Sequence, residues 1–111
     1  MKFLVISHLK DTFSTLPPSV VRQLWEANME LVNQARKAGK IREIYWIPGW
    51  NRGVSIEDKK SAEEVVQTLS GSPMFAFLDF EVYPLADPFE SMKAYTEALK
   101  TAEKMFPTPP R

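Results

Sequence analysis

Three side chains in this sequence are our candidates for catalysing a proton transfer: His8, Asn28 and Tyr45. His8 is the only histidine, and histidine is the residue whose unperturbed pKa lies near neutrality. An inward amide at Asn28 can hydrogen-bond a carbonyl or orient a water, but it cannot carry a proton near neutral pH. A buried Tyr45 hydroxyl needs a partner, and a backbone group or a substrate carbonyl can fill that role. The alternative is that His8 is a partly exposed residue at the end of a strand and takes no part in catalysis.

Aromatic side chains supply candidate walls for a binding pocket. The stretch IYWIPGWNRG, residues 44–53, places Trp50 at a turn, where a tryptophan has no core of its own to fill. Trp25, Phe75 and Phe77 complete the substrate-binding candidates. Trp25 also fits a second helical stripe that packs against a neighbouring subunit or another helix.

Several kinds of site lack support in the sequence. His8 has no histidine or cysteine companions, so we expect no metal site. P-loop, GxGxxG, GxSxG and HExxH motifs are missing, and no cofactor is expected. Asp79 and Glu81 share one strand face, which suits acid/base chemistry or pairing with Arg42 or Lys2 across strands.

Composition narrows the class of protein. The chain has 111 residues, no cysteine, and 14 basic against 14 acidic residues. Nucleic-acid binding normally requires a basic excess, so no nucleic-acid partner is expected. The N-terminal apolar run is short and lacks a cleavage site, and no stretch reaches the roughly 20 residues of a membrane span. We expect a cytoplasmic protein without a membrane partner.

The periodicity of apolar residues predicts the elements that position these side chains. Residues 2–9 read as a strand, 19–38 as a helix that Pro17-Pro18 opens and Gly39 ends, and 40–48 and 53–57 as a hairpin. A capping box at Ser61 and Glu64 starts a second helix, which Gly71 ends. Residues 74–85 read as a strand and 89–105 as a helix, and the tail FPTPPR as an extended arm.

This order predicts a single ferredoxin-like α+β domain over residues 1–111, with a four-stranded antiparallel sheet and an extra C-terminal helix from about residue 88. We place Phe3, Val5, Met74, Ala76, Leu78, Phe80 and Val82 under the helices. Leu4, Ile6, Ile44, Trp46, Phe75 and Phe77 then face away. Both faces are apolar and need cover, so we expect sheet-to-sheet dimerisation, with the C-terminal helix covering the remainder.

Residues 39–85 resemble the central half of muconolactone delta-isomerase and its relatives. The most specific portion is Gly71-Ser72-Pro73-Met74-Phe75 followed by DFEVYPL, residues 79–85. The resemblance covers about three quarters of the chain. It implies a subunit that pairs into a dimeric α/β barrel, and cofactor-free isomerisation of an unsaturated lactone from aromatic catabolism.

The resemblance also bears on the site. It favours an inward Tyr45, and it aligns Asn28 with a glutamate of the first helix that serves the family as a candidate acid/base group. With Asn28 unable to carry a proton, His8 becomes the candidate carrier. We therefore expect an isomerase-like enzyme that shifts a C=C bond within a small lactone or related acid. A cofactor-free monooxygenase of the dimeric barrel type and a non-catalytic oligomeric module that binds a small molecule are the alternatives.

Overall fold

The computed structural model describes residues 1–108 and gives the element order that the sequence predicts. The elements are β1 (Lys2–Leu9), the 3-10 helix η1 (Asp11–Thr15), α1 (Pro18–Lys37), β2 (Ile41–Ile47), β3 (Arg52–Asp58), α2 (Ala62–Ser70), the 3-10 helix η2 (Phe75–Phe77), β4 (Leu78–Leu85) and α3 (Pro88–Met105).

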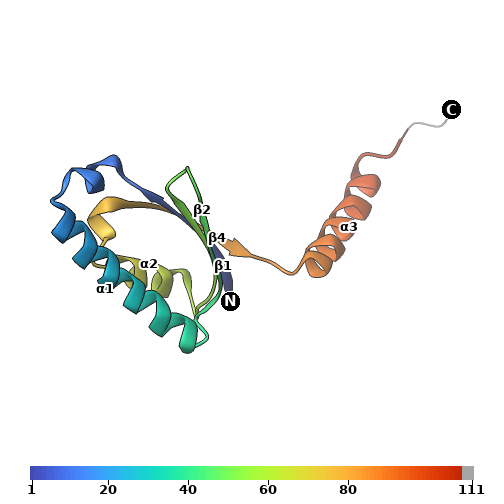
Figure 1. Cartoon of the computed structure of the whole chain (residues 1–111). Coiled ribbons are helices and arrows are strands. Elements are labelled where there is room, and N and C mark those ends of the chain that lie inside the picture. Colours follow the sequence, from blue (N-terminus) through green and yellow to red (C-terminus); the bar gives the residue numbers. More distant parts are fainter. Residues whose placement is uncertain (109–111) are drawn as a thin grey trace.

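The four strands form one antiparallel sheet in the order β2-β3-β1-β4, and α1 and α2 cover one of its faces (Figure 1). This arrangement confirms the ferredoxin-like α+β fold with βαββαβ order. The face without these helices is called the outer face below, and the face under them the inner face.

Local sequence signals set the helix boundaries. Pro18 occupies the first turn of α1, where a missing backbone N–H costs no intrahelical bond. Gly39 follows the helix with φ of +74°, a left-handed conformation that glycine adopts without steric cost. Ser61 caps α2 by accepting a hydrogen bond from the Glu64 N–H over 3.2 Å. The Glu64 carboxylate reaches back to the Lys60 N–H over 2.7 Å, which completes the cap.

The core lies between α2 and the β1–β4 half of the sheet. Phe3, Val5 and Val65 are fully buried, with Leu69, Phe80 and Val82 packed against them. The predicted inward orientation of Phe3, Val5, Phe80 and Val82 is therefore correct.

Strand β2 faces the opposite way from our expectation. Ile44 and Trp46 lie opposite Ser55 and Gly53 of β3, on the inner face, whereas Tyr45 lies opposite Val54 on the outer face. The cause is a register shift between Ile41 and Glu43, a β-bulge that inserts one extra residue and reverses the alternation that follows.

The last strand is shorter than predicted. Residues 75–77 form η2, and β4 begins only at Leu78. Phe75 and Phe77 consequently precede the strand and do not share its alternation, so their predicted placement on the outer face of the sheet is wrong.

The C-terminal helix α3 stands apart from the sheet and the other helices (Figure 1), and it gives the chain extents of 73 × 29 × 23 Å. Within residues 1–108, no helix is both long enough and apolar enough to cross a membrane. The extended arm predicted for the tail lies partly outside the described residues.

Candidate functional site

An aromatic cluster connects α1 with the inner face of the sheet. The Trp25 ring of α1 meets Trp46 of β2 edge-on, with centroids 5.8 Å apart, and Phe13 of η1 at 6.3 Å. Phe13 also contacts Phe77 of η2 at 5.6 Å. Trp25 and Trp46 remain partly exposed even though they contact each other, so this cluster offers apolar surface that a flat ligand can contact.

A polar pair lies on the side of α1 that faces the fold. Asn28 is half-buried, and its Oδ1 accepts a hydrogen bond from the Ser72 hydroxyl over 2.9 Å. Ser72 Oγ in turn accepts the Met74 N–H over 3.1 Å. This directional chain leaves the Asn28 Nδ2 hydrogens without a protein acceptor in the part of the chain that the structure describes. The amide can therefore donate to a carbonyl oxygen of a ligand.

Strand β3 and the residue that follows it carry buried polar side chains. Glu57 is 5% exposed and Lys59 3% exposed, and their charged groups lie 3.6 Å apart. The Ser55 hydroxyl donates to the other Glu57 oxygen over 2.7 Å. Burying charges costs several kcal/mol unless they are paired and hydrogen-bonded, as these are. Glu57 is thus a held carboxylate on the same sheet face as Trp46.

An open groove of about 640 Å³ runs along the first half of α1. Its apolar lining comes from Leu16, Pro18, Val21, Trp25 and Met29, and Ser14, Arg22 and Glu26 also line it. Trp25 belongs to both the groove and the aromatic cluster, so one side chain separates the two.

His8 and Tyr45 lie on the outer face, away from Asn28. His8 is exposed and sits opposite Arg52 and Asp79 in the sheet register. Tyr45 is 63% exposed, and its hydroxyl donates to the Glu43 carboxylate over 3.4 Å. The expected inward orientation of Tyr45 is wrong, because the bulge in β2 turns Trp46 inward instead.

The remaining predicted residues are divided in the same way. Trp25 and Phe77 join the aromatic cluster, whereas Phe75 stacks on Phe80 with centroids 6.4 Å apart. Trp50 is 70% exposed at the hairpin turn.

The acidic pair of β4 lies on the outer face. Asp79 pairs with Lys10 over 3.6 Å, not with the Arg42 or Lys2 that the sequence suggested. Glu81 accepts the Tyr83 hydroxyl over 3.0 Å, and this bond raises the pKa of Tyr83 above its ordinary value.

Sequence reasoning missed four contributors to this region: Phe13, Trp46, Ser72 and Glu57. Ser72 had a usable signal, because it lies in the Gly71–Phe75 segment that carries the family resemblance. Glu57 also alternates with Ser55 at positions where a strand otherwise presents its core face, which is a detectable pattern of buried polarity. Phe13 lies in an irregular segment without periodicity.

The comparisons with known proteins agree with this fold. The family model for muconolactone delta-isomerase matches residues 1–91. A crystal structure of muconolactone isomerase superposes with a TM-score of 0.68 at 30% identity, and the match covers 79% of this chain and 92% of that one.

A second solved structure shares the fold at lower identity. It is 5-chloro-2-hydroxyhydroquinone dehydrochlorinase from Burkholderia phenoliruptrix AC1100, in complex with 2,5-dihydroxybenzoquinone. Its TM-score is 0.63 at 14% identity, and the match covers 81% of this chain and 98% of that one. A search of curated protein sequences found no match. On the family match over residues 1–91, this chain belongs to the muconolactone delta-isomerase family.

Proposed function

We propose that this protein is a cofactor-independent isomerase that shifts a C=C bond within a small unsaturated lactone or a related acid. Membership of the family supports the reaction class. The observation that carries the proposal is the Ser72–Asn28 hydrogen bond, because it orients an amide donor from the helix that covers the inner face of the sheet.

In the proposed reaction a base removes a proton from a carbon activated by the lactone carbonyl, which gives an enolate. The same proton, or one from water, then returns to a different carbon, so the product is an isomer of the substrate. Asn28 Nδ2 donates to the enolate oxygen as its negative charge develops, and a positioned donor of this kind contributes about 10²–10³ in rate.

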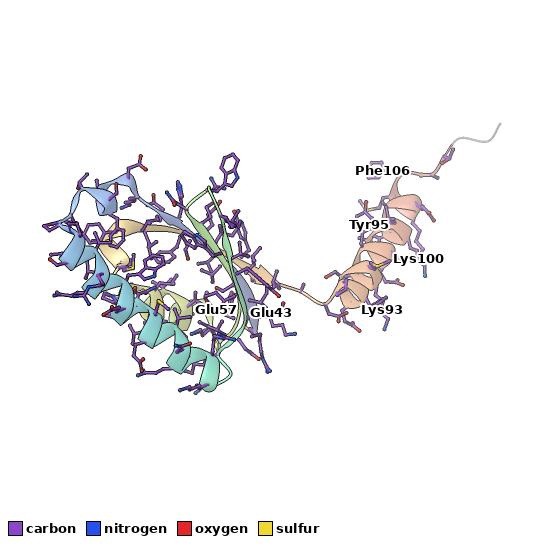
Figure 2. The ribbon with its side chains drawn as sticks, in the orientation of Figure 1. Glu43, Glu57, Lys93, Tyr95, Lys100 and Phe106 are labelled. Carbon is purple, nitrogen blue, oxygen red and sulfur yellow. The ribbon has the colours of Figure 1, made fainter. Side chains whose placement is uncertain are left out.

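We assign the role of base to Glu57. It is a carboxylate on the inner face, and the Ser55 hydroxyl and Lys59 hold it in place. Figure 2 labels Glu57 and Glu43, which the register places on opposite faces of the sheet. Of these two carboxylates, Glu57 is therefore the one on the side of the sheet that faces Asn28. His8 lies on the other face, so the proposed mechanism does not depend on it.

The test is the isomerisation of muconolactone, followed by ultraviolet absorbance, with the full-length protein. We expect turnover in the wild type and its loss in Asn28→Asp. Asn33→Asp is the matched control, because Asn33 is an exposed asparagine of the same helix. The absence of turnover by folded wild-type protein would overturn the assignment to muconolactone, and related lactones would then be assayed.

Two other functions would be detected by different assays. A cofactor-free monooxygenase would consume oxygen when a planar aromatic substrate is added. A binding module would quench the fluorescence of Trp25 and Trp46 on adding a ligand and would return the ligand unchanged.

We also propose that two copies of the chain pair through their outer faces. Leu4, Ile6, Val54 and Ile56 form the centre of this face, with the exposed side chains of Tyr45, Ile47 and Tyr83 around them. A contiguous apolar surface of this kind is typical of an interface. Sedimentation of Ile6→Lys against the wild type tests the pairing, and an unchanged mass would contradict it.

A further inference from the structure

Helix α3 has an apolar stripe without a partner among residues 1–108, the part of the chain that the structure describes. The 3.6-residue turn of an α-helix places Met92, Tyr95, Leu99 and Ala102 on one side, and Phe106 continues the line. These residues are called the α3 stripe. Tyr95 is 67% exposed, and Met92, Leu99 and Phe106 are also exposed. An isolated helix gains little stability in water without a surface to pack against.

Four charged residues lie on the opposite side of α3 and form two ion pairs. Lys93 pairs with Glu90 over 3.7 Å and Lys100 with Glu97 over 3.3 Å. In Figure 2, Tyr95 and Phe106 project to one side of the helix, and Lys93 and Lys100 to the other. A helix with ion-paired residues on one side and an exposed apolar stripe on the other typically packs against another surface through that stripe.

The link between β4 and α3 directs the helix away from its own sheet. Asp87 is extended, with φ of −66° and ψ of 127°, and caps α3 by accepting the Glu90 N–H over 2.9 Å. Pro88 follows, and a proline disfavours the helical conformation in the residue before it. A short link of this kind favours exchange between copies over folding back.

The groove along α1 matches the α3 stripe in its apolar character. It is apolar along Leu16, Val21, Trp25 and Met29, and it is open on the surface. The 18 residues of α3 span about 27 Å, enough to lie along several turns of another helix. We propose that α3 of one copy packs its stripe into the α1 groove of a second copy, and that the second copy returns its own α3.

Three observations favour a second copy as the occupant. The family model ends at residue 91. The structural match covers 92% of the isomerase chain but 79% of this chain, so most of α3 extends beyond the part that the family shares. The chain has no net charge that would oppose self-association. A reciprocal exchange also makes the same contact twice, which brings the buried area toward the roughly 800 Å² per partner of a stable interface.

The exchange would bear on the site as well. Trp25 lines the groove and contacts Trp46. The α3 helix of the second copy would therefore pack against Trp25 on the side of the aromatic cluster that faces the groove. The inference itself does not rest on the proposed isomerase activity, and its test involves no substrate.

The test uses the natural absence of cysteine. Leu99→Cys and Met29→Cys are made in separate full-length chains with different affinity tags, co-expressed, purified through both tags and oxidised mildly. Both positions are exposed within one chain, so we expect both variants to fold, which circular dichroism checks. The control replaces Leu99→Cys by Lys93→Cys, on the polar side of α3.

We expect a disulfide between the two differently tagged chains with Leu99→Cys, in at least about tenfold greater yield than with Lys93→Cys. Equal yields from both positions would indicate random collision and overturn the proposal. A chain that carries both Leu99→Cys and Met29→Cys reports folding back: an internal disulfide there, with no product between chains, also overturns it. If no disulfide forms in any combination, α3 does not bind in the groove and the proposal is overturned.

Discussion

Ser72 donates its hydroxyl hydrogen to Asn28 Oδ1 over 2.9 Å, which joins α1 to the segment that leads into β4. The bond fixes the amide so that its N–H groups, rather than its oxygen, are available to a ligand. The sequence alone allows two catalytic roles for position 28. The side chain there can donate a hydrogen bond to the enolate, or it can be the acid/base group implied by the glutamate of the family, and the Ser72 bond favours the first role.

The variant Asn28→Asp distinguishes these roles by the sign of its effect. The carboxylate still accepts the Ser72 hydrogen, so we expect the fold to be kept. It removes the donor and adds a negative charge beside the developing enolate, so kcat should fall about 100-fold. Steady-state rates measure this, with Asn33→Asp as the control. A rise in kcat would instead show that a carboxylate at this position carries the proton.

The buried ion pair predicts a non-additive change in stability. Glu57→Gln leaves the buried Lys59 charge without its counter-charge and should cost about 3 kcal/mol of the free energy of unfolding. The double variant Glu57→Leu with Lys59→Met removes both charges and should cost less than Glu57→Gln alone. Urea unfolding of Glu57→Leu, Lys59→Met and the double variant measures this coupling. Strictly additive losses would show that the two side chains do not stabilise each other.

Trp46 in β2 and Trp50 in the turn that follows should differ in their effects. Trp46→Ala removes the contact with Trp25 and should cost about 3 kcal/mol at most, since Trp46 is only partly buried. It should also raise KM for a lactone substrate. Trp50→Ala, at an exposed position, should change stability by less than about 0.5 kcal/mol. If Trp50→Ala changed KM more than Trp46→Ala does, the ligand would instead be assigned to the hairpin turn.

Acid should destabilise the protein through two carboxylates. The hydrogen bond from Lys40, aided by the Lys60 N–H, lowers the pKa of Glu64 below its ordinary value. The hydrogen bond from Arg42, then the N-terminal amine, lowers the pKa of Asp58. A depressed pKa in the folded state stabilises the protein above the ordinary pKa, and this stability is lost as the pH falls through the folded value.

The urea midpoint of the wild type should therefore fall between about pH 5 and about pH 2. Glu64→Gln should have a lower midpoint than the wild type at pH 7 and lose less on acidification. Parallel curves for the two proteins would show that Glu64 does not contribute to the acid sensitivity.

The sequence predicted the fold because each element carries its own local signal. The capping box at Ser61, the paired prolines before α1 and Gly39 after it mark boundaries that the structure reproduces within one or two residues. The helical stripe also placed Asn28 on the side of α1 that faces the fold, where the Ser72 bond holds it. These features depend on neighbours in the chain, so a sequence can display them.

The predicted site was less accurate because it depended on relations between strands. The resemblance favoured an inward Tyr45, whereas the bulge before Glu43 turns Trp46 inward and Tyr45 outward. His8 was chosen for its chemistry, whereas its position in β1 places it on the outer face. The spacing of Glu57 and Lys59 suits one strand face, but their burial as an ion pair depends on the α1 and α2 helices that cover that face.

The bulge in β2 has an evolutionary consequence. β2 is an edge strand with β3 as its single neighbour in the sheet, so a gain or loss of one residue beyond the bulge can be absorbed without re-pairing β1 and β4. Such a length change would exchange the indole of Trp46 for the phenol of Tyr45 beneath α1. Descendants of this chain can thus acquire a polar wall in place of an apolar one through a single codon insertion or deletion. The same change would exchange Ile44 and Ile47 between the two faces of β2, while β1, β3 and β4 stay paired as they are.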